Sequence, residues 1–419
     1  MKNLKEQITK IAQGAKSASR ELAVISRKDK DRALLAMAGA LIKNKELILK
    51  ANQKDLFIAR KSKLSEAMID RLTLTQKRIE GMAESFEVIA GLDDPVSRIL
   101  ESWQASNGLL IRKVSVPIGV IGIIYESRPN VTADCAALCL KSGNAAILRG
   151  GKEALNSNLA IFKILEKSAF LCGIPKGAIN LITAMDRSAI RIIAGLTGLV
   201  DLVMPRGGEA LINEITKHAK VPVIKHYKGI CHVYVDKKAG LDMAEEIAFN
   251  AKVQRPGVCN AMETLLVHKD IAAQFLPSMI KRFKSANVEI RGCAKTKKIV
   301  KDIKSAKETD WYTEYLDLIL SVKVVDSLEE AIDHINKYGS MHSDSIITKD
   351  KDAAKQFLQY IDSSCVYVNA STRFTDGGEF GFGAEIGIST EKLHARGPMA
   401  LKELTTYKYH IVGNGQVRE

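Results

Sequence analysis

The hydrophobic positions of the first ninety residues recur at helical spacing. Leu, Ile, Ala and Met alternate with charged residues from about residue 4 to residue 90, with interruptions near residues 26–28 and 62–64. Apolar residues three and four apart share one side of a helix, and such interruptions mark helix ends. The pattern predicts a segment made only of helices.

The pattern changes near residue 108, where GLLIRKVSVPIGVIGIIYE is rich in β-branched residues. A break at residues 117–119 predicts an extended arm followed by a buried strand. Strands are then expected at residues 119–125, 145–148, 179–182, 199–204 and 221–224, with helices at 131–141, 156–170, 186–194 and 209–219. This alternation predicts a doubly wound parallel sheet, whose dinucleotide sites lie at the C-terminal ends of the strands.

A second α/β run begins at residues 233–235. Helices are expected at residues 241–251, 271–285, 328–338 and 351–361, with strands at 264–268, 318–325, 345–348 and 365–369. The tail LKELTTYKYHIVG is extended and β-branched, so it can pair with the arm at residues 109–116 or with another subunit. The chain is therefore expected to be an α/β protein with two lobes and a small β arm.

Composition narrows the class of protein. Hydrophobic residues make up 46% and charged residues 26%, as in soluble globular proteins. The Met1 end lacks the order of a signal peptide, and the longest apolar stretch, around residues 117–125, is too short to span a bilayer. We expect a soluble cytoplasmic protein that binds no membrane.

The net charge of +14 allows several partners: nucleic acid, an acidic membrane surface or a small polyanion. The lysines are dispersed through the first hundred residues instead of forming one stripe, which is typical of a solvated basic surface. Aromatic residues are only 5%, so base stacking has little to use. A nucleic-acid-binding protein stays as an alternative supported by charge alone.

No metal site is expected. The seven cysteines have no CxxC spacing, and Cys135 and Cys139 lie four apart on one face of an apolar helix. The eight histidines are scattered, and His218 and His226 lack partnering cysteines or carboxylates nearby.

Two glycine turns are candidates for phosphate binding. Arg149, Gly150, Gly151 and Lys152 follow one predicted strand, and Arg206, Gly207 and Gly208 follow another. Backbone amides, a helix dipole and cations can converge on an anion at such turns. Neither turn matches GxGxxG, and paired glycines also occur in ordinary tight turns, but both at one sheet edge favour a dinucleotide.

Cys259 is the candidate nucleophile. It lies in the Gly/Pro loop Gln254–Ala261 beside Arg255, whereas Cys135, Cys139, Cys172 and Cys231 lie in apolar stretches. A nearby cation and loop amides lower a thiol pKa from about 8.5 and favour the reactive thiolate. The alternative is a small buried hydrophobic residue. Residues 313–317 and 368–378 form further polar loops at strand ends.

The motifs together resemble a known family. YESRPNVT, LKSGNAAILRGG, MPRGG, QRPGVCN, TEYLDLI, VNASTRFTDGGEFGFGAEIGIST and HARGP occur here in the order typical of γ-glutamyl phosphate reductases, a branch of the aldehyde dehydrogenase superfamily. The resemblance covers essentially the whole chain. It implies a Rossmann-type cofactor domain (residues 1–105 and 119–235), a catalytic domain (236–390) and an oligomerisation arm and tail (106–118 and 391–419).

The resemblance also implies roles for individual residues. Cys259 takes the nucleophile position and Glu314 the position that holds the nicotinamide ribose, with Leu316 beside it. Lys152 falls where NAD-preferring members often carry a glutamate, which suits the 2′-phosphate of NADPH. The predicted sites are catalytic, Cys259, Ser127 and Asn260; cofactor-binding, Arg149, Gly150, Gly151, Lys152, Arg206, Gly207, Gly208, Glu314 and Leu316; and substrate-binding, Arg128, Asn130, Asn369, Ser371 and Arg373.

Two departures from the wider superfamily bear on the chemistry. Where oxidising members carry a general-base glutamate, this chain reads HYKG at residues 226–229, without a carboxylate. That base activates water against a thioester, so its absence suits a reductase. The usual oxyanion-hole asparagine is also absent from the aligned stretch Glu126–Asn130, so the side chain that joins the Cys259 amide there stays open.

The implied reaction is NADPH-dependent reduction of L-glutamyl 5-phosphate to L-glutamate 5-semialdehyde through a cysteine thioester, in proline biosynthesis. Homo-oligomers, dimers or tetramers, and coupling to glutamate 5-kinase are expected. An aldehyde dehydrogenase that oxidises another small aldehyde is the closest alternative, which the missing base disfavours. A catalytically inactive relative is disfavoured by the presence of Cys259.

Overall fold

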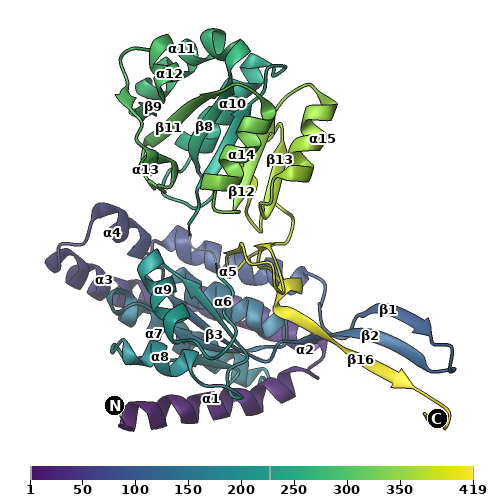
Figure 1. The fold of residues 1–419 in the computed structure, drawn as a ribbon. Coiled ribbons are helices and arrows are strands. Elements are labelled where there is room, and N and C mark those ends of the chain that lie inside the picture. The colour runs from purple at the N-terminus through teal and green to yellow at the C-terminus, as the bar shows by residue number, and fades with distance from the viewer. Residues whose placement is uncertain (1, 226–227, 419) are drawn as a thin grey trace. The chain divides into compact units, whose positions relative to one another are not determined.

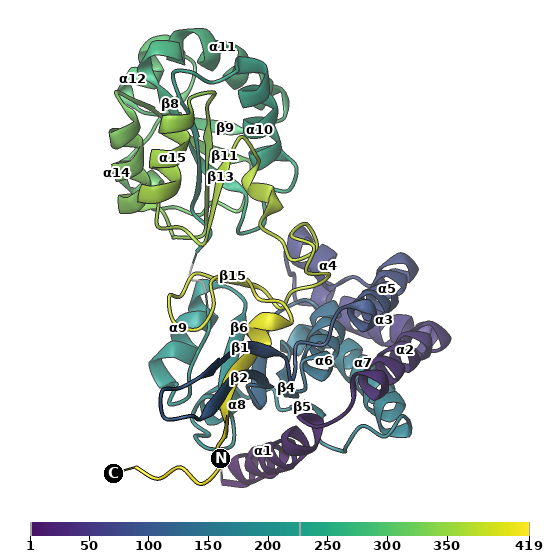
Figure 2. The same ribbon diagram turned by 90° about the vertical axis from the view of Figure 1, so that its right-hand side faces the viewer.

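The computed structural model describes residues 2–225 and 228–418, and these divide into two compact units. Unit 1 holds the chain up to residue 225 together with residues 381–387 and those from 399 onward. Unit 2 holds the described residues of 226–380 and 388–398. Figures 1 and 2 show the elements of each unit, coloured along the chain.

Unit 1 begins with helices and continues with alternating strands and helices. Its elements are α1 (Lys2–Leu22), α2 (Arg27–Lys43), α3 (Lys45–Lys61), α4 (Glu66–Leu72), α5 (Gln76–Gly91), β1 (Ile99–Gln104), β2 (Leu110–Pro117), β3 (Val120–Tyr125), α6 (Asn130–Lys141), β4 (Ala145–Arg149), η1 (Lys152–Ala154), α7 (Leu155–Leu171), β5 (Ile179–Leu181), α8 (Ser188–Ala194), β6 (Leu202–Arg206), α9 (Glu209–His218), η3 (Lys402–Leu404) and β16 (Thr405–Val412).

Side-chain caps define the breaks between the first helices. Ser26, Ser65 and Thr75 accept hydrogen bonds from the amides of Asp29, Met68 and Arg78, at the starts of α2, α4 and α5. A capped start satisfies amides that have no partner within the helix. The helical N-terminal segment is confirmed, with further breaks at Asn44 and before Thr75 that the sequence pattern did not predict.

The sheet of unit 1 is parallel, with strand order β5-β4-β3-β6. The chain moves in one direction from β3 to β4 to β5 and returns past β3 to β6. Because parallel crossovers are right-handed, α6 and α7 cover one face of the sheet and α8 covers the other. Helices α2, α3 and α5 pack behind α6 and α7 (Figure 1). The predicted doubly wound sheet is confirmed in this unit.

The strand expected at residues 221–224 is wrong. Only an isolated bridge between Val203 and Val223 forms there. Pro222 supplies no amide, and its carbonyl accepts from the amide of Val203. A segment of four apolar residues with a proline in it therefore lies beside β6 without becoming a strand.

The C-terminal tail pairs with the predicted arm. β16 runs antiparallel to β2, from Thr405 opposite Pro117 to Val412 opposite Leu110, which confirms one of the two expected pairings. β1, which the sequence pattern missed, completes the three-stranded sheet. Figure 1 shows these strands as a ribbon reaching away from the helices of unit 1. The arm exposes apolar and aromatic side chains, including Trp103, Tyr407, Tyr409 and Ile411.

Unit 2 contains a parallel sheet with more strands than that of unit 1. Its elements are β7 (Cys231–Val235), α10 (Leu241–Val253), β8 (Met262–His268), α11 (Lys269–Ser285), β9 (Glu289–Gly292), α12 (Ala294–Ile299), β10 (Lys304–Ser305), α13 (Glu308–Trp311), β11 (Ile319–Val325), α14 (Leu328–Tyr338), β12 (Ser343–Ile347), α15 (Lys351–Tyr360), β13 (Cys365–Val368), η2 (Thr372–Phe374), β14 (Ile388–Ser389) and β15 (Gly397–Pro398).

Two hydrophobic clusters cover the two faces of that sheet, whose strand order is β10-β9-β11-β8-β7-β12-β13. On one face, side chains of α10 and α11 such as Ala248 and Phe275 pack on Val233 and Leu265. On the other face, side chains of α14 and α15 pack on Tyr234, Leu266 and Ile346. Adjacent residues of one strand belong to opposite clusters, as expected for a sheet covered on both sides.

The expected domain boundary at residue 235 is ten residues too late. β7 pairs in parallel with β8 and β12, so it is a central strand of the unit 2 sheet. β7 and the strands of unit 1 have the same apolar character, and sequence alone gave no reason to separate them. The short strands β9 and β10 were also missed, because they are too short to show a period.

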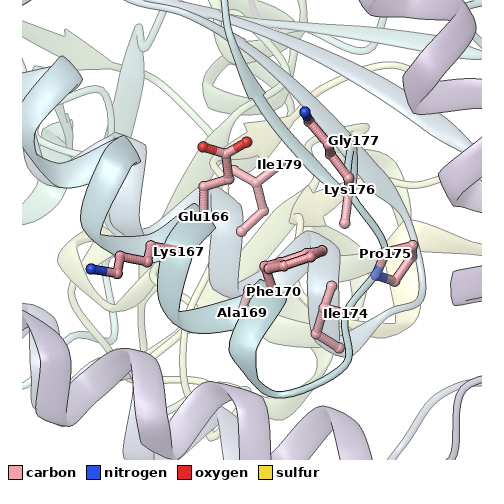
Figure 3. Close-up of a pocket in the computed structure, with 10 residues that line it drawn as sticks. Glu166, Lys167, Ala169, Phe170, Ile174, Pro175, Lys176, Gly177 and Ile179 are labelled. Carbon is pink, nitrogen blue, oxygen red and sulfur yellow. The ribbon is translucent and has the colours of Figure 1, made fainter.

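A cavity of ≈ 240 Å³ in unit 1 lies away from the predicted dinucleotide edge. Its lining is Glu166, Lys167, Ala169, Phe170, Ile174, Pro175, Lys176, Gly177, Ala178 and Ile179. Figure 3 shows Phe170 among Ile174, Pro175 and Ile179. These residues end α7 and lead into the start of β5, so the cavity is at the N-terminal end of a parallel strand. Dinucleotides bind at the opposite, C-terminal ends.

Two buried histidines of unit 2 should make the fold sensitive to acid. Burial lowers the pKa of His334 to about 2 and that of His342 to about 4. In the unfolded chain both would take up a proton below pH 6.5, whereas the folded chain keeps them neutral. We expect the contribution of these two histidines to the free energy of unfolding to be constant above about pH 6.5 and to fall by about 1.4 kcal/mol per pH unit per histidine below it. The raised pKa values of Asp134 and Glu263 act in the opposite direction.

The variant His334→Phe should remove about half of this dependence. Its ring can keep the aromatic contacts with Trp311 and Tyr338, whose centroids lie 5.2 and 4.5 Å away. Urea unfolding at pH 7.0 and pH 5.5 measures the change. An equal loss in wild type and variant would contradict the assignment.

Among residues 2–225 and 228–418, the helices are all too short or too polar to cross a lipid bilayer.

Candidate functional site

Cys259 lies on the loop that joins α10 to β8 in unit 2. The loop spans residues 254–261, and Cys259 is partly exposed, in contrast to the buried Cys135, Cys139, Cys231 and Cys365. α10 ends at Val253, because Pro256 disfavours a helical backbone at the residue before it. β8 begins at Met262. The predicted nucleophile is thus accessible on a loop that two regular elements anchor.

Gly229 and Cys231 lie against the backbone of Cys259. A Cβ atom placed on Gly229 would be 1.9 Å from the carbonyl oxygen of Cys259 and 2.5 Å from its Cα. The thiol of Cys231 donates to the same carbonyl oxygen at 3.2 Å. The segment entering β7 therefore holds the Cys259 loop, residues 254–261, from one side, and only glycine fits at residue 229.

Arg373 and Asn260 hold the loop from the other side. Arg373 donates to the amide oxygen of Asn260 and, through Nε, to the amide oxygen of Gln254 at 2.9 Å. Burial lowers the pKa of Arg373, but its attraction to Cys259 acts in the opposite direction, so the guanidinium is within electrostatic reach of the thiol. A cation beside the thiol favours the thiolate form.

Asn260 makes hydrogen bonds through both its side chain and its backbone. Its Nδ2 donates to the carbonyl oxygen of Thr375 at 2.9 Å, and its backbone carbonyl accepts from the hydroxyl of Thr372 at 2.7 Å. Asn260 is buried. These contacts tie the Cys259 loop to η2, so Asn260 holds the loop in place in addition to any catalytic role it was predicted to have.

A chain of hydroxyl groups continues behind this contact. The hydroxyl of Thr375 lies 2.6 Å from that of Ser343 and 2.7 Å from that of Tyr367. Ser343 also lies 2.8 Å from Nδ1 of His342. Burial and these contacts fix Thr375, whose carbonyl in turn holds Asn260. Sequence reasoning included Thr375 only as part of the polar loop 368–378, and it missed Ser343 and Tyr367 because hydroxyl groups on strands carry no distinctive pattern.

Glu314 and Leu316 lie on the loop between α13 and β11. The Glu314 carboxylate accepts from the amide of Gly229 at 2.9 Å. The Leu316 amide donates to Glu263 at 3.1 Å. The loop that carries the predicted ribose-binding glutamate is therefore linked to the glycine that packs on Cys259.

Asn369 and Ser371, both predicted to bind substrate, also have structural partners. The Asn369 side chain accepts from the amide of Thr348 and donates to its carbonyl oxygen, each at 2.9 Å. Ser371 caps η2 by accepting from the Arg373 amide at 3.3 Å. The structure brings Arg373 close to Cys259, while Asn369 is tied to the end of β12.

In unit 1, three loops leave the same edge of the sheet. β4 ends at Arg149, which pairs with Ile124 of β3, and β6 ends at Arg206, which pairs with Tyr125. Because the strands are parallel and adjacent, the segments that follow them emerge side by side. The predicted Ser127, Arg149–Lys152 and Arg206–Gly208 groups are therefore brought to one edge.

The two arginines at this edge fit an anionic ligand. Arg149 is only 7% exposed, and its guanidinium donates to the carbonyl of Met185 at 3.3 Å. Within the described residues, Nε of Arg149 and Nε of Arg206 are buried without a hydrogen-bond partner. Buried polar groups are normally paired, so two such donors at one edge suit the phosphates of a dinucleotide.

The glycines at the edge allow close approach of the backbone. A Cβ on Gly150 would meet Nδ2 of Asn158 at 2.1 Å, and one on Gly207 would meet Glu126 at 2.5 Å. Gly151 precedes η1, whose first residue is the exposed Lys152. These features fit a turn against which a pyrophosphate can pack.

Two carboxylates at the same edge were not predicted. Glu153 accepts from both the amide and the hydroxyl of Ser127, at 2.7 and 2.8 Å. Glu126 accepts from the amide of Gly208 at 3.1 Å. The Ser127 hydroxyl, predicted to be catalytic, and the Gly208 amide, predicted to bind the cofactor, thus have carboxylate partners here. The sequence pattern predicted a role for the adjacent Lys152 but none for Glu153.

Asn130 and Arg128 complete this edge. Asn130 opens α6 and donates to Asp134 at 3.0 Å, and Arg128 is half-buried just before it. Burial raises the pKa of Asp134 to about 6, while Arg206 opposes that shift. These residues lie near the arginines of unit 1, and their roles with substrate stay predictions.

Three of the predicted site residues have left-handed backbones. φ is +43° at Ser127, +54° at Leu316 and +56° at Asn369. Such conformations cost of order 1–3 kcal/mol for residues other than glycine and cluster at functional sites. The segment HYKG, where the general-base glutamate is absent, lies partly outside the described residues, at His226 and Tyr227.

The chain matches known proteins along nearly all of its length. The model of the aldehyde dehydrogenase family matches residues 2–317 and 299–409. The γ-glutamyl phosphate reductase of Caldanaerobacter subterraneus subsp. tengcongensis is 58% identical over 408 residues, 97% of this chain and 99% of that protein. The chain belongs to the aldehyde dehydrogenase family, among its γ-glutamyl phosphate reductases.

Solved structures support the same placement. The crystal structure of γ-glutamyl phosphate reductase from Thermotoga maritima has a TM-score of 0.96 at 48% identity, covering 98% of this chain and 100% of that one. Glyceraldehyde-3-phosphate dehydrogenase GapN from Methanocaldococcus jannaschii, complexed with NADP, has a TM-score of 0.72 at 17% identity, covering 98% and 95%. The latter likeness supports the fold alone. The expected fold class and family are confirmed.

Proposed function

We propose that this protein reduces L-glutamyl 5-phosphate to L-glutamate 5-semialdehyde with release of phosphate, as a step of proline biosynthesis. The observation that carries the proposal is the 58% identity to a γ-glutamyl phosphate reductase over 97% of the chain. The partly exposed Cys259 beside Arg373 gives that identity a chemical basis.

The nicotinamide cofactor typical of the family is proposed to be NADPH, bound by the glycine turns of unit 1. Arg149, Arg206 and the turn amides would hold its phosphates, and the exposed Lys152 would meet the 2′-phosphate. To contact the pyrophosphate, the Gly208 amide would give up its hydrogen bond to Glu126. Glu314 would hold the nicotinamide ribose. When bound, the cofactor supplies the hydride that reduces the acyl group.

Cys259 is proposed to be the nucleophile. Its thiolate attacks the acyl carbon, the bond to the phosphate oxygen breaks, and phosphate leaves with the electron pair. A γ-glutamyl thioester remains on the sulfur. After reduction, the carbon–sulfur bond breaks, the semialdehyde leaves and the thiolate is restored. Arg373 would favour the thiolate. Either Arg128 or Arg373 is proposed to meet the phosphate or the α-carboxylate of the substrate.

The thioester must be protected from water until it is reduced. Residues 226–229 read HYKG, so the segment contains no carboxylate to act as a general base. Without that base, water attack is slow and phosphate or hydride chemistry can compete. The same feature disfavours an enzyme that oxidises aldehydes to acids.

The arm is proposed to join subunits into a homo-oligomer. Trp103, Tyr407, Tyr409 and Ile411 are all more than two-fifths exposed on its three strands. Exposed aromatic side chains on a β arm are suited to pairing with a second copy. The size of the oligomer, coupling to glutamate 5-kinase and a cytoplasmic location stay predictions from the sequence.

The reverse reaction tests the proposed function. Purified wild type is supplied with glutamate 5-semialdehyde, NADP⁺ and phosphate, and nicotinamide absorbance is followed. We expect a signal that requires phosphate. A rate that is independent of phosphate would identify an aldehyde-oxidising enzyme instead, and no signal would reject both activities.

The variant Lys152→Glu should change the preference between cofactors. A carboxylate would repel the 2′-phosphate and suit the ribose hydroxyls of NADH. We expect kcat/KM for NADP⁺ to fall by about tenfold to a hundredfold, the usual size of a lost charged hydrogen bond, with that for NAD⁺ unchanged or raised. The matched control is the exposed Lys163→Glu on α7. Equal losses in both variants, or none in Lys152→Glu, would place the 2′-phosphate elsewhere.

A further inference from the structure

A fully buried ion pair flanks the Cys259 loop. Lys252 on α10 and Glu263 on β8 lie on either side of Cys259 in the chain, and Nζ of Lys252 is 2.6 Å from Oε2 of Glu263. Neither side chain is exposed. Burial raises the pKa of Glu263 to about 7 and lowers that of Lys252, while their mutual attraction opposes both shifts.

Such a pair is a poor way to stabilise a core. Removing two charges from water costs several kcal/mol per ion, and hydrophobic residues of similar volume often serve packing equally well. α10 and β8 already contribute Ala248, Ala251, Leu265 and Val267 to a well-filled hydrophobic cluster. The pair therefore calls for an explanation in what its remaining atoms contact.

The second oxygen of Glu263 contacts the loop of Glu314. Oε1 accepts from the Leu316 amide at 3.1 Å, and Leu316 has the unfavourable φ of +54°. Nζ of Lys252 lies 5.9 Å from the ring centroid of Tyr315, the residue that separates Glu314 from Leu316 in the sequence. A carboxylate that accepts from the amide of a strained residue can hold a backbone conformation that the chain alone would not prefer.

The contacts continue from that loop to the nucleophile. Glu314, two residues before Leu316, accepts from the Gly229 amide at 2.9 Å. Gly229 packs against the Cys259 carbonyl so closely that no Cβ fits. The order of contact is Lys252, Glu263, Leu316, Glu314, Gly229 and Cys259. This path returns to the loop that the ion pair flanks.

We propose that Glu263, held by Lys252, is a positioning residue that fixes the strained Glu314 loop and thereby the backbone around Cys259. Neither residue touches the reacting atoms. Glu263 acts through the Leu316 amide, and Lys252 keeps its carboxylate turned toward that amide. The inference rests on the proposed function for its effect on turnover, but its structural part is independent of the substrate.

Two double variants separate this role from charge and packing. Lys252→Gln/Glu263→Gln and Lys252→Met/Glu263→Met both remove the charges and have similar volumes. Only the glutamine pair keeps an oxygen that can accept from Leu316. We expect the methionine pair to lower kcat by about tenfold or more, as for other small misplacements of a site. The glutamine pair should stay within about threefold of wild type, and KM for the semialdehyde should change little in both.

Hydrogen exchange supplies a second readout that needs no activity. In wild type and in the glutamine pair, the amides of Leu316 and Gly229 should both be protected, and in the methionine pair both should exchange faster. Equal kcat losses in the two doubles, or wild-type kcat in the methionine pair, would overturn the proposal. If the methionine pair does not fold, fast exchange of either amide in wild type would overturn it. Failure of the proposed function would appear separately, as wild type without the phosphate-dependent reaction.

Discussion

Cys259→Ala should lose activity by about 10⁴-fold or more, the usual cost of removing a covalent nucleophile. Alanine cannot form the thioester. The loop at residues 254–261 holds no other cysteine, and Cys231, which contacts the loop, is buried and donates to the Cys259 carbonyl. The rate of phosphate-dependent NADP⁺ reduction measures the loss. Cys259 is partly exposed, so the free energy of unfolding should change by less than about 1 kcal/mol.

Cys172→Ala is the matched control for this variant. Cys172 is also a partly exposed thiol, but it lies at the end of α7 in unit 1. It should keep full activity. A Cys259→Ala protein that retains a tenth or more of the wild-type rate would rule out a thioester at this residue.

Gly229→Ala should cause the second largest loss. A methyl group would be 1.9 Å from the Cys259 carbonyl oxygen, and the neighbouring atoms are backbone that cannot rotate away. The two segments must separate, which displaces Cys259 and breaks the hydrogen bond from Gly229 to Glu314. We expect kcat to fall by about a hundredfold. The free energy of unfolding should fall by about 1–3 kcal/mol.

Steady-state kinetics and urea unfolding of the same preparation measure both effects. Gly81→Ala on α5 is the control, because a Cβ there meets no atom within 4 Å. Alanine is a better helix former than glycine, so that control should be unchanged in rate and more stable by up to about 1 kcal/mol. Wild-type kinetics in Gly229→Ala would show that the Cys259 loop tolerates the displacement.

The order of strands and helices could be predicted because it depends on local patterns. Apolar runs such as residues 120–125 and 145–148 are bounded by glycine or polar residues, so their pairing in a parallel sheet followed from the alternation with helices. The same order brought Arg149 and Arg206 to one edge, as expected. The division between units could not be predicted, because β7 has the same apolar character as the strands before it.

The parts of the site that were missed depend on contacts between distant residues. Glu153 holds Ser127 across 26 positions, and Glu263 reaches Leu316 across 53. A charged residue in a sequence is usually exposed, so nothing marked Lys252 and Glu263 as buried. Left-handed backbones at Ser127, Leu316 and Asn369 are equally invisible, because these residue types do not require that conformation.

The main difference between the predicted and the observed site is that several predicted side chains already have hydrogen-bond partners within the protein. Asn260 and Ser127 were predicted to be catalytic and Asn369 to bind substrate, and each is hydrogen-bonded within its own unit. Short polar side chains suit both roles, and sequence does not distinguish them. Arg373, by contrast, lies where its charge can act on Cys259.

A single-turnover experiment tests the thioester most directly. Wild type is mixed with glutamate 5-semialdehyde and NADP⁺ in the absence of phosphate, and nicotinamide absorbance is recorded while the Cys259 peptide is analysed by mass spectrometry. We expect a burst of about one NADPH per active site, a γ-glutamyl group on Cys259 and steady turnover only after phosphate is added. Steady turnover without phosphate, or a burst that leaves Cys259 unmodified, would contradict a thioester that is kept from water.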